Sequence, residues 1–392
     1  MHDNKQRPLV RVIGPQYFLY FGVMGVFLPF FNLYCYHLGF SGFQIGVLSG
    51  IRSVALVVFP LFWGLVADRF HARRSIYIGC NLASSLVWAF LLFTADFRAM
   101  AAIIALYGVF YAPIISFLEA FTMDALGDDK KSYGRLRAYG SISFILTVLV
   151  LGKILDITGV GIIVALILAG SLVQAAASLR IPDVQIKKRR TDGAGIKVFF
   201  RPKVLIFLTC AFLMLVSHGT YYGFFSIHLE TLGLGKTFIG FSWALASTAE
   251  ILVMIKSDKL FEKFSLERVL IFSFIIAAVR WSILFTTASA GIILLSQILH
   301  AVTYGTFHMA SILYIDRLTP DASKTMGQAV NNAVTYGLGL VIGFLFSGVL
   351  YESLGAYNLF GISSLIALAA GGIFFLLNFL NSTGGIDTPA KG

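Results

Sequence analysis

Apolar runs of about twenty residues recur along the chain, and each is separated from the next by a short polar segment. An α-helix needs a run of about this length to cross the hydrocarbon core of a bilayer. The pattern therefore predicts an all-α membrane protein with twelve transmembrane helices. The runs lie near residues 14–37, 43–66, 75–95, 99–125, 134–155, 158–180, 203–230, 237–256, 267–287, 289–315, 325–351 and 355–381.

The longest polar segment divides these runs into two sets of six. It covers residues 181–202 and contains a run of four basic residues beginning at Lys187. We predict two pseudo-symmetric six-helix bundles at residues 1–180 and 203–381, joined by this cytoplasmic linker and followed by a cytoplasmic tail at 382–392. The basic run is expected to orient the two bundles, and a lipid or regulatory site is the alternative.

The composition agrees with this class, since 58% of the residues are hydrophobic and only 12% are charged. A soluble domain is about a quarter charged. The net charge of +11 could indicate a nucleic-acid partner, but the charges lie in short loops. With both termini in the cytoplasm, only Arg98, Lys153 and Lys236 face the other side, Arg52 and Arg280 lie inside runs, and all other Lys and Arg are cytoplasmic. This asymmetry supports the topology and argues against nucleic-acid binding.

Several ionisable residues lie deep inside the apolar runs. Charges at such depth are costly, so they usually pair or line a water-filled cavity. Glu119 and Arg137 lie at equal sequence distances from Asp128, so two oppositely directed helices would place them at about the same depth. Ionisable residues lie inside the apolar runs of both halves, which favours a shared hydrated cavity over scattered structural pairs. The other such residues are Arg52, His218, Glu250, Arg280, His300 and His308.

A charged loop separates the second and third runs, and a weaker echo of it, Asp258 to Arg268, lies at the matching place in the second half. An acid at a helix end followed by basic residues can hold two helix ends together. The loop resembles the loop motif of the major facilitator superfamily, which implies a cytoplasmic gating motif; ordinary loop charges are the alternative. Its residues are Gly64, Asp68, Arg69, Arg73 and Arg74.

Two further resemblances concern the charges inside the runs. Glu119-Ala-Phe and Tyr133-Gly-Arg135-x-Arg137 resemble the substrate-binding carboxylate and arginine of the lactose permease group. The chain departs from that group at Gln297 and Thr303, where a lysine and an acid are expected. The resemblance that covers most of the chain is to the phenylpropionate permease family, a branch of the same superfamily. It rests on His218, Tyr221-Tyr222-Gly-Phe, Ala-Glu250, Val-Arg280-Trp281, Gln297-Ile-Leu-His300 and His308.

These resemblances imply a secondary transporter with the major facilitator fold that takes up a small organic solute by proton-coupled alternating access. An aromatic carboxylate such as a phenylpropionate-like acid fits the narrower family, whereas a sugar or nucleoside fits the wider group. A transporter-like substrate sensor or a channel is the alternative of another class. The expected substrate-binding residues are Glu119, Arg137, Arg52, Tyr221, Tyr222 and Arg280, and the expected proton-coupling residues are Glu250, His300, His308 and Arg280.

No enzyme motif is visible: the sequence has no His-Glu-x-x-His, no Gly-x-Ser-x-Gly and no phosphate-binding loop. Cys35, Cys80 and Cys210 have neither metal-ligand nor disulfide-framework spacing. We therefore expect no catalytic residue, no metal and no cofactor, with the proton gradient as energy source. The expected partners are a small-molecule substrate, protons and the lipid bilayer. We expect a monomer in the bacterial cytoplasmic (inner) membrane.

Overall fold

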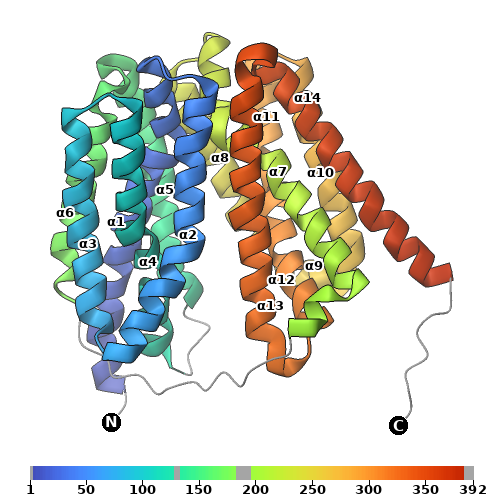
Figure 1. Cartoon of the computed structure of the whole chain (residues 1–392), viewed down its shortest axis with the longest axis horizontal. Coiled ribbons are helices and arrows are strands. Elements are labelled where there is room, and N and C mark those ends of the chain that lie inside the picture. Colours follow the sequence, from blue (N-terminus) through green and yellow to red (C-terminus); the bar gives the residue numbers. More distant parts are fainter. Residues whose placement is uncertain (1–2, 128–132, 182–195, 384–392) are drawn as a thin grey trace. The chain divides into compact units, whose positions relative to one another are not determined.

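The computed structural model describes residues 3–127, 133–181 and 196–383, and every regular element in these ranges is a helix (Figure 1). The all-α prediction is therefore confirmed. Most of the predicted linker and tail lies outside the described residues. The helices of the first half are α1 (Asp3–His37), α2 (Gly42–Phe70), α3 (Arg73–Ala89), α4 (Phe97–Leu126), α5 (Tyr133–Thr158) and α6 (Ile163–Ser178).

The second half contains shorter pieces because two of its crossings are interrupted by π-helical turns, η6 (Ala301–Thr306) and η8 (Ala333–Gly339). Such turns occur often at functional sites. The α-helices are α7 (Pro202–Thr231), α8 (Lys236–Ile255), α9 (Ser257–Lys263), α10 (Leu266–Thr286), α11 (Ala290–Ser296), α12 (Phe307–Leu318), α13 (Lys324–Asn332) and α14 (Leu340–Thr383).

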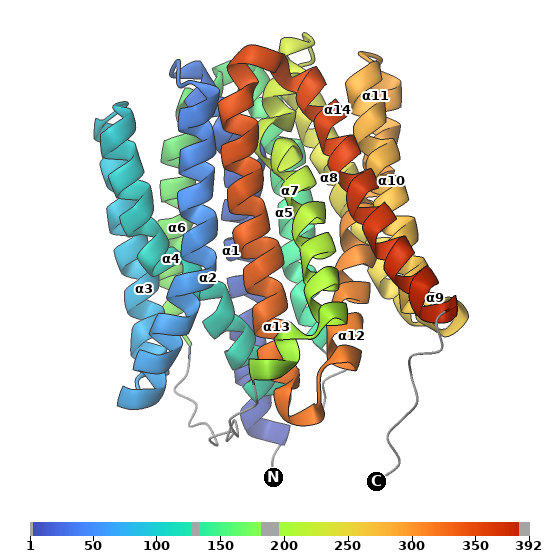
Figure 2. The ribbon, with the colours of Figure 1, turned by 45° about the vertical axis from the view of Figure 1, so that its right-hand side comes forward.

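Eleven stretches of the described chain are long and apolar enough to cross a membrane. The last one, Lys324–Asn378, has 55 residues, more than twice what one crossing requires. Its helix α14 breaks at Gly355, where φ is 70°. Glycine adopts this left-handed conformation without a Cβ clash, and it commonly ends a helix. The break, visible as a sharp turn of α14 in Figure 2, divides the stretch into two crossings, as the sequence predicted.

The chain forms two compact units whose limits do not follow chain order. Unit 1 comprises Met1–Arg189, Tyr222–Ser247 and Phe344–Ser353, and unit 2 comprises Arg190–Tyr221, Thr248–Gly343 and Leu354–Gly392. Unit 1 thus combines the first-half helices with the second part of α7, the first part of α8 and a short stretch of α14. The predicted bundles at 1–180 and 203–381 remain a prediction.

Within unit 1, α1 is the central helix and packs against α4, α5 and α6. Its contact with α5 is close because α1 has small residues there: a Cβ added to Gly25 would lie 3.0 Å from Thr147, and one added to Gly22 would lie 2.9 Å from Ser143. Helices without large side chains at their contact can approach closely in a membrane. Because α1 packs against three other helices, its side chains line the interior of unit 1.

Within unit 2, α10 packs against α12 and the π-helical turn η6. Helix α7 crosses the start of α14 backbone to backbone, since a Cβ on Gly219 would lie 2.3 Å from the carbonyl carbon of Gly343. This contact fixes the part of α7 that carries His218 and Tyr221. We use "outer end" for the helix ends that carry few Lys and Arg and that the charge pattern predicts to face away from the cytoplasm.

Candidate functional site

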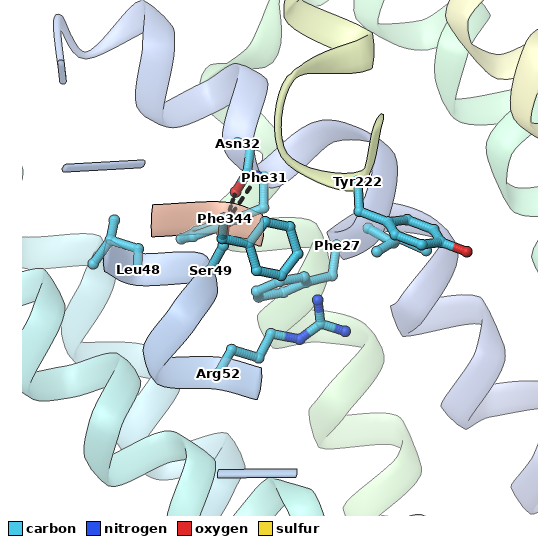
Figure 3. A pocket seen from close by; sticks show the side chains of 9 residues that line it. Phe27, Phe31, Asn32, Leu48, Ser49, Arg52, Tyr222 and Phe344 are labelled. Atoms are coloured by element: carbon cyan, nitrogen blue, oxygen red, sulfur yellow. Dashed lines mark hydrogen bonds between the residues drawn. The ribbon is translucent and has the colours of Figure 1, made fainter. Parts of the chain in front are cut away.

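A pocket in unit 1 is walled by aromatic rings and contains the cation of Arg52 (Figure 3). The cavity itself is small, about 10 Å³, which is room for about one water molecule, so a larger ligand requires its side chains to move apart. Ligand sites are commonly concave and mostly apolar, with a few polar groups that fix orientation. The lining residues are Phe27, Leu28, Phe31, Asn32, Leu48, Ser49, Arg52, Tyr222 and Phe344.

Arg52 is half-buried and its guanidinium points toward Phe27 (Figure 3). The guanidinium carbon lies 4.4 Å from the centre of the Phe27 ring, and Nη2 lies 3.3 Å from the sulfur of Met24. Within the described part of the chain, no carboxylate lies within ion-pair distance of Arg52. The guanidinium is therefore held by an aromatic face and a weak acceptor, which leaves donors available to an anion.

Asn32 and Ser49 fix the other side of this pocket. The Asn32 amide donates to the Ser49 hydroxyl at 3.0 Å and to the carbonyl oxygen of Gly223 at 3.0 Å, and the Ser49 hydroxyl lies 3.3 Å from Asn32 Oδ1. Ser49 and Arg52 lie one helical turn apart on α2, so they share one face. Asn32 thereby connects α1 to α2 and to the part of α7 that carries Tyr222. The sequence signal for Asn32 is a strongly polar side chain inside an apolar run.

The predicted residues Glu119 and Arg137 also lie in unit 1, on α4 and α5. No ion pair joins them in the described residues. Glu119 is exposed, and the Arg137 guanidinium lies 3.8 Å from the centre of the Phe21 ring on α1. Phe21 and Phe27 are six residues apart on the same helix, so the two rings that the arginines contact are attached about 9 Å apart along it. The structure thus brings Arg137 and Arg52 to successive levels of one helix.

Arg280 in unit 2 has a different environment: it is 0% exposed, yet its two terminal nitrogens have hydrogen-bond acceptors. Nη2 donates to Gln297 Oε1 at 2.8 Å, and Nη1 donates to His300 Nδ1 at 2.9 Å and to the Thr303 hydroxyl at 3.3 Å. Its flat face lies 4.2 Å from the centre of the Tyr221 ring. Arg280 is therefore part of an internal polar network.

Gln297 holds this network to its helix. Its Oε1 also accepts the Tyr221 hydroxyl at 3.1 Å, and its amide nitrogen donates to the carbonyl of Ile293 at 2.9 Å. A lysine at this position could not accept from Arg280, whereas a neutral amide can. The two consecutive tyrosines have different surroundings, because Tyr221 belongs to this network and Tyr222 lines the pocket of unit 1.

Hydrogen-bond chemistry fixes the state of His300. Arginine only donates, so the Nδ1 atom that faces Arg280 must accept, and the ring proton of the neutral imidazole is on Nε2. Nε2 lies 3.8 Å from Glu250 Oε2. Glu250 packs against the π-helical turn at Gly305, where a Cβ would lie 3.0 Å from its Cγ. The network thus runs from Arg280 through His300 to Glu250.

His308 lies one turn beyond Tyr304, and both are half-buried. The Tyr304 ring stacks with His300 at 5.2 Å and with His308 at 6.1 Å between centres. His308 Nδ1 lies 2.7 Å from the hydroxyl of Tyr336, which comes from the second π-helical turn. Neither Tyr304 nor Tyr336 is among the site residues predicted from the sequence. Among the described residues, no group of three or more His, Cys, Asp and Glu is placed to hold a metal ion.

In the predicted gating motif, Arg73 joins two acids at the ends of neighbouring helices. Its guanidinium lies 3.2 Å from Asp124 on α4 and 3.7 Å from Asp68 on α2. Sequence analysis did not assign Asp124. An acid in the last turn of a helix is unfavourable for the helix dipole, so its presence there is a signal for a cation nearby.

The neighbouring Arg74 caps another helix end in unit 1, since it donates to the carbonyl oxygens of Ile181 at 2.5 Å and Leu179 at 3.2 Å, just after α6. Arg69 is exposed, and a Cβ on Gly64 would meet no atom within 4 Å. In unit 1 the motif therefore ties the ends of α2, α3, α4 and α6 through Arg73 and Arg74.

The comparisons with known proteins agree with this architecture. Residues 12–362 match the model of the MFS_1 like family. The chain is 29% identical over 368 residues, 90% of its length and 94% of the relative's, to the "Probable 3-phenylpropionic acid transporter" of Escherichia coli (strain K12). It is 23% identical to the maltose permease of Geobacillus stearothermophilus, covering 88% and 89% of the two chains.

Among solved structures, that of the nucleoside transporter NupG has the same fold. The TM-score is 0.84 at 17% identity, over 94% of this chain and 99% of that one. The sequence resemblance to the superfamily is thereby confirmed, and the family and these relatives are transporters rather than enzymes. The chain belongs to the MFS_1 like family and is a multi-pass secondary transporter of the major facilitator kind.

Proposed function

We propose that this transporter takes up a small aromatic carboxylate, such as a phenylpropionate-like acid, together with protons, by alternating access. The observation that carries this proposal is the Arg52 pocket. A guanidinium binds a carboxylate through two parallel hydrogen bonds, and aromatic walls suit a flat apolar body. The protein would act as a monomer in the bacterial inner membrane with both termini cytoplasmic, and the proton gradient would be its energy source, without a cofactor.

Arg52 is better placed than Arg280 to bind a substrate carboxylate. Each terminal nitrogen of Arg280 already donates to a protein acceptor, and a ligand would have to displace Gln297 or His300. Leaving a buried polar group without a partner costs about 1–3 kcal/mol. Arg52 has no such bonds to give up except the contact with Met24. Arg137, which contacts the ring of Phe21 on α1, would contact any second polar group of the substrate together with Glu119.

Glu250 is the proposed proton acceptor. His300 commits Nδ1 to Arg280, so it positions the network and cannot gain a proton without losing that bond. Glu250 accounts for the missing acid at Thr303, because it approaches the same histidine from α8. Protonation of Glu250 would leave the Arg280 charge uncompensated inside unit 2. Such a buried charge is unfavourable, and this would favour the next conformation of the cycle.

One proton carried with one monocarboxylate moves no net charge. Accumulation would then follow the pH gradient, up to about tenfold per pH unit, because each pH unit is worth about 1.4 kcal/mol per proton. It would not follow the membrane potential, although a net charge would gain about 2.3 kcal/mol per 100 mV. This stoichiometry distinguishes the proposal from an electrogenic symporter.

The test is uptake of labelled 3-phenylpropionate into proteoliposomes with an imposed pH gradient or an imposed potential. The wild type should accumulate substrate with the pH gradient and lose it with a protonophore. Glu250→Gln should exchange substrate across the membrane without accumulating it. Glu262→Gln, which changes an exposed acid on α9, is the matched control and should behave like wild type. Accumulation by Glu250→Gln would contradict the proton role.

A sugar or a nucleoside is the second candidate substrate. It is favoured by Glu119 and Arg137, which do not form an ion pair in the described residues and could hydrogen-bond hydroxyl groups. A ligand that binds the folded state raises its apparent stability. A thermal-shift comparison of 3-phenylpropionate, maltose and nucleosides on purified protein would separate the candidates. A sensor would bind without uptake, and a channel would never accumulate substrate.

A further inference from the structure

Helix α8 begins without a capping side chain of its own. Gly235 precedes it, so the first backbone N–H groups need an acceptor from elsewhere. Asp156, near the outer end of α5, supplies it: Oδ1 accepts the N–H of Lys236 at 2.6 Å, and Oδ2 accepts the N–H of Thr237 at 2.9 Å. A carboxylate from a distant part of the chain thus acts as the N-cap of α8.

Helix α2 has a similar contact at its outer end. Ser41 and Gln44 form a local capping box, in which each side chain bonds the other's backbone N–H. The N–H of Gly42 is not served by this box and donates to Glu352 Oε1, near the end of the eleventh crossing, at 2.7 Å. The first turn of α2 is therefore completed by a carboxylate 310 positions away in the sequence.

The two contacts correspond to each other in a duplicated fold. If the halves are repeats, the second and eighth crossings are equivalent, and so are the fifth and eleventh. Asp156 caps the eighth crossing from the fifth, and Glu352 caps the second from the eleventh. Both contacts lie within unit 1. Two equivalent contacts of the same chemistry argue for a selected feature rather than an incidental surface contact.

The capped helices also meet backbone to backbone, which makes the caps sensitive to small movements. A Cβ on Gly46 would lie 2.5 Å from the carbonyl oxygen of Phe344, and one on Gly240 would lie 2.2 Å from that of Val148. Charge-assisted hydrogen bonds of 2.6–2.9 Å weaken steeply with distance. Separation of these helices would therefore break all three bonds to the two carboxylates.

A third polar contact joins the same ends. Glu230 near the end of α7 lies 2.7 Å from the ammonium of Lys236 and 2.6 Å from Nε2 of His37 at the end of α1. The outer ends of α1, α7 and α8 are thereby connected through one carboxylate. Ion pairs of this kind are worth about 0.2–1 kcal/mol each, whereas a helix cap is worth about 1 kcal/mol.

We infer that Asp156 and Glu352 are gating residues, which stabilise the state closed at the outer side by capping helices α8 and α2 from other crossings. Their negative charges also complement the positive ends of those helices. The caps are made when the outer ends meet and are lost to water when they part. This inference rests on the proposed alternating access, but not on the identity of the substrate or on proton coupling.

The test measures the outer ends directly by electron–electron spin resonance distances. One pair of spin labels, on Ile157 and Phe241, reports on α5 and α8; the other, on Phe43 and Val349, reports on α2 and α14, and all four positions are exposed. Asp156→Ala should raise the ratio of long to short distances about fivefold, as expected for the loss of one cap. Glu352→Ala should do the same.

The two changes share no partner, so together they should raise the ratio about 25-fold. Each single change should lengthen both label pairs, because a gate opens as a body. If Asp156→Ala lengthens only the nearer pair, α8 merely frays and the gating role is wrong. Unchanged distances in both variants would also overturn it.

Asp96→Ala is the matched control, since Asp96 caps its own helix α4 through the N–H of Ala99 at 2.9 Å. This control variant should destabilise that end of α4 without changing either distance distribution. If it lengthens the distances as well, the opening is a general effect of losing an outer cap, and the specific role of Asp156 and Glu352 is wrong. Uptake assays keep this test separate from the proposed function. Distances that shift in a protein without 3-phenylpropionate uptake support the gate and contradict the substrate.

Discussion

Arg52 and Arg280 are the same residue type at similar positions, each well inside a helix that crosses the membrane, but they are used differently. Arg280 is completely buried and its terminal nitrogens are hydrogen-bonded to Gln297, His300 and Thr303. Arg52 is half-buried, and its described contacts are a ring and a sulfur. The comparison shows that depth alone does not identify a ligand site. What distinguishes the two is whether the donors are already used inside the protein.

The largest effect should come from Arg280→Gln. Removing the guanidinium leaves His300 Nδ1 and the Thr303 hydroxyl without this donor and an unfilled space between Tyr221 and Trp281. We expect a loss of about 2–6 kcal/mol of stability, from two buried acceptors left unsatisfied at about 1–3 kcal/mol each, and complete loss of uptake. Thermal unfolding of purified protein and proteoliposome uptake measure both. If this variant unfolds at the wild-type temperature, the network is not structural and the comparison fails.

Arg52→Gln should affect binding instead. A hydrogen bond to a charged group is worth about 1.5–3 kcal/mol, so the KM for 3-phenylpropionate should rise about 10- to 100-fold. The unfolding temperature should not fall, since only the weak sulfur acceptor of Met24 loses its donor. Arg98→Gln removes the same charge from an exposed position and is the control. An unchanged KM would mean that the carboxylate binds elsewhere, and Arg137 would then be the next candidate.

The helices could be predicted from sequence because length and hydropathy suffice for them. Even the break between the last two crossings was predicted near Gly355, where the chain has the backbone conformation that glycine permits. Arg52 and Arg280 were both identified as charges within the membrane. Their different roles could not be predicted, because the acceptors around Arg280 are neutral residues. Gln297 and Thr303 were noticed only as departures from a related pattern.

The missed residues share a different cause. Asp124, Asp156 and Glu352 lie near helix ends, where an acid looks like an ordinary loop charge. Their roles depend on which other helix end lies beside them, and hydropathy carries no information about that. Phe27 and Phe344 line the Arg52 pocket but are indistinguishable in sequence from the many phenylalanines that face lipid.

The smallest expected effects concern the inner ends, where the two units resemble each other with reversed charge. Arg73 at the start of α3 pairs with Asp124 at the end of α4, whereas Glu267 at the start of α10 pairs with Arg317 at the end of α12. These are the third and fourth crossings of one half and the ninth and tenth of the other. Partly exposed pairs of this kind are worth about 0.2–1 kcal/mol.

The charges of the two ion pairs relate differently to the helix dipoles. Glu267 and Arg317 complement the ends at which they lie, but Arg73 and Asp124 oppose theirs. Asp68 explains the unfavourable order, because a carboxylate in place of Arg73 would lie near the Asp68 carboxylate, which is now 3.7 Å from the guanidinium. The exchange Arg73→Asp with Asp124→Arg should therefore lower the free energy of unfolding. Adding Asp68→Asn should restore the free energy of unfolding to the wild-type value or raise it above that value by about 0.3–1 kcal/mol. Unfolding in a denaturing detergent measures these free energies. If the exchange leaves the free energy of unfolding unchanged while Asp68 is present, Asp68 does not determine the order of the two charges.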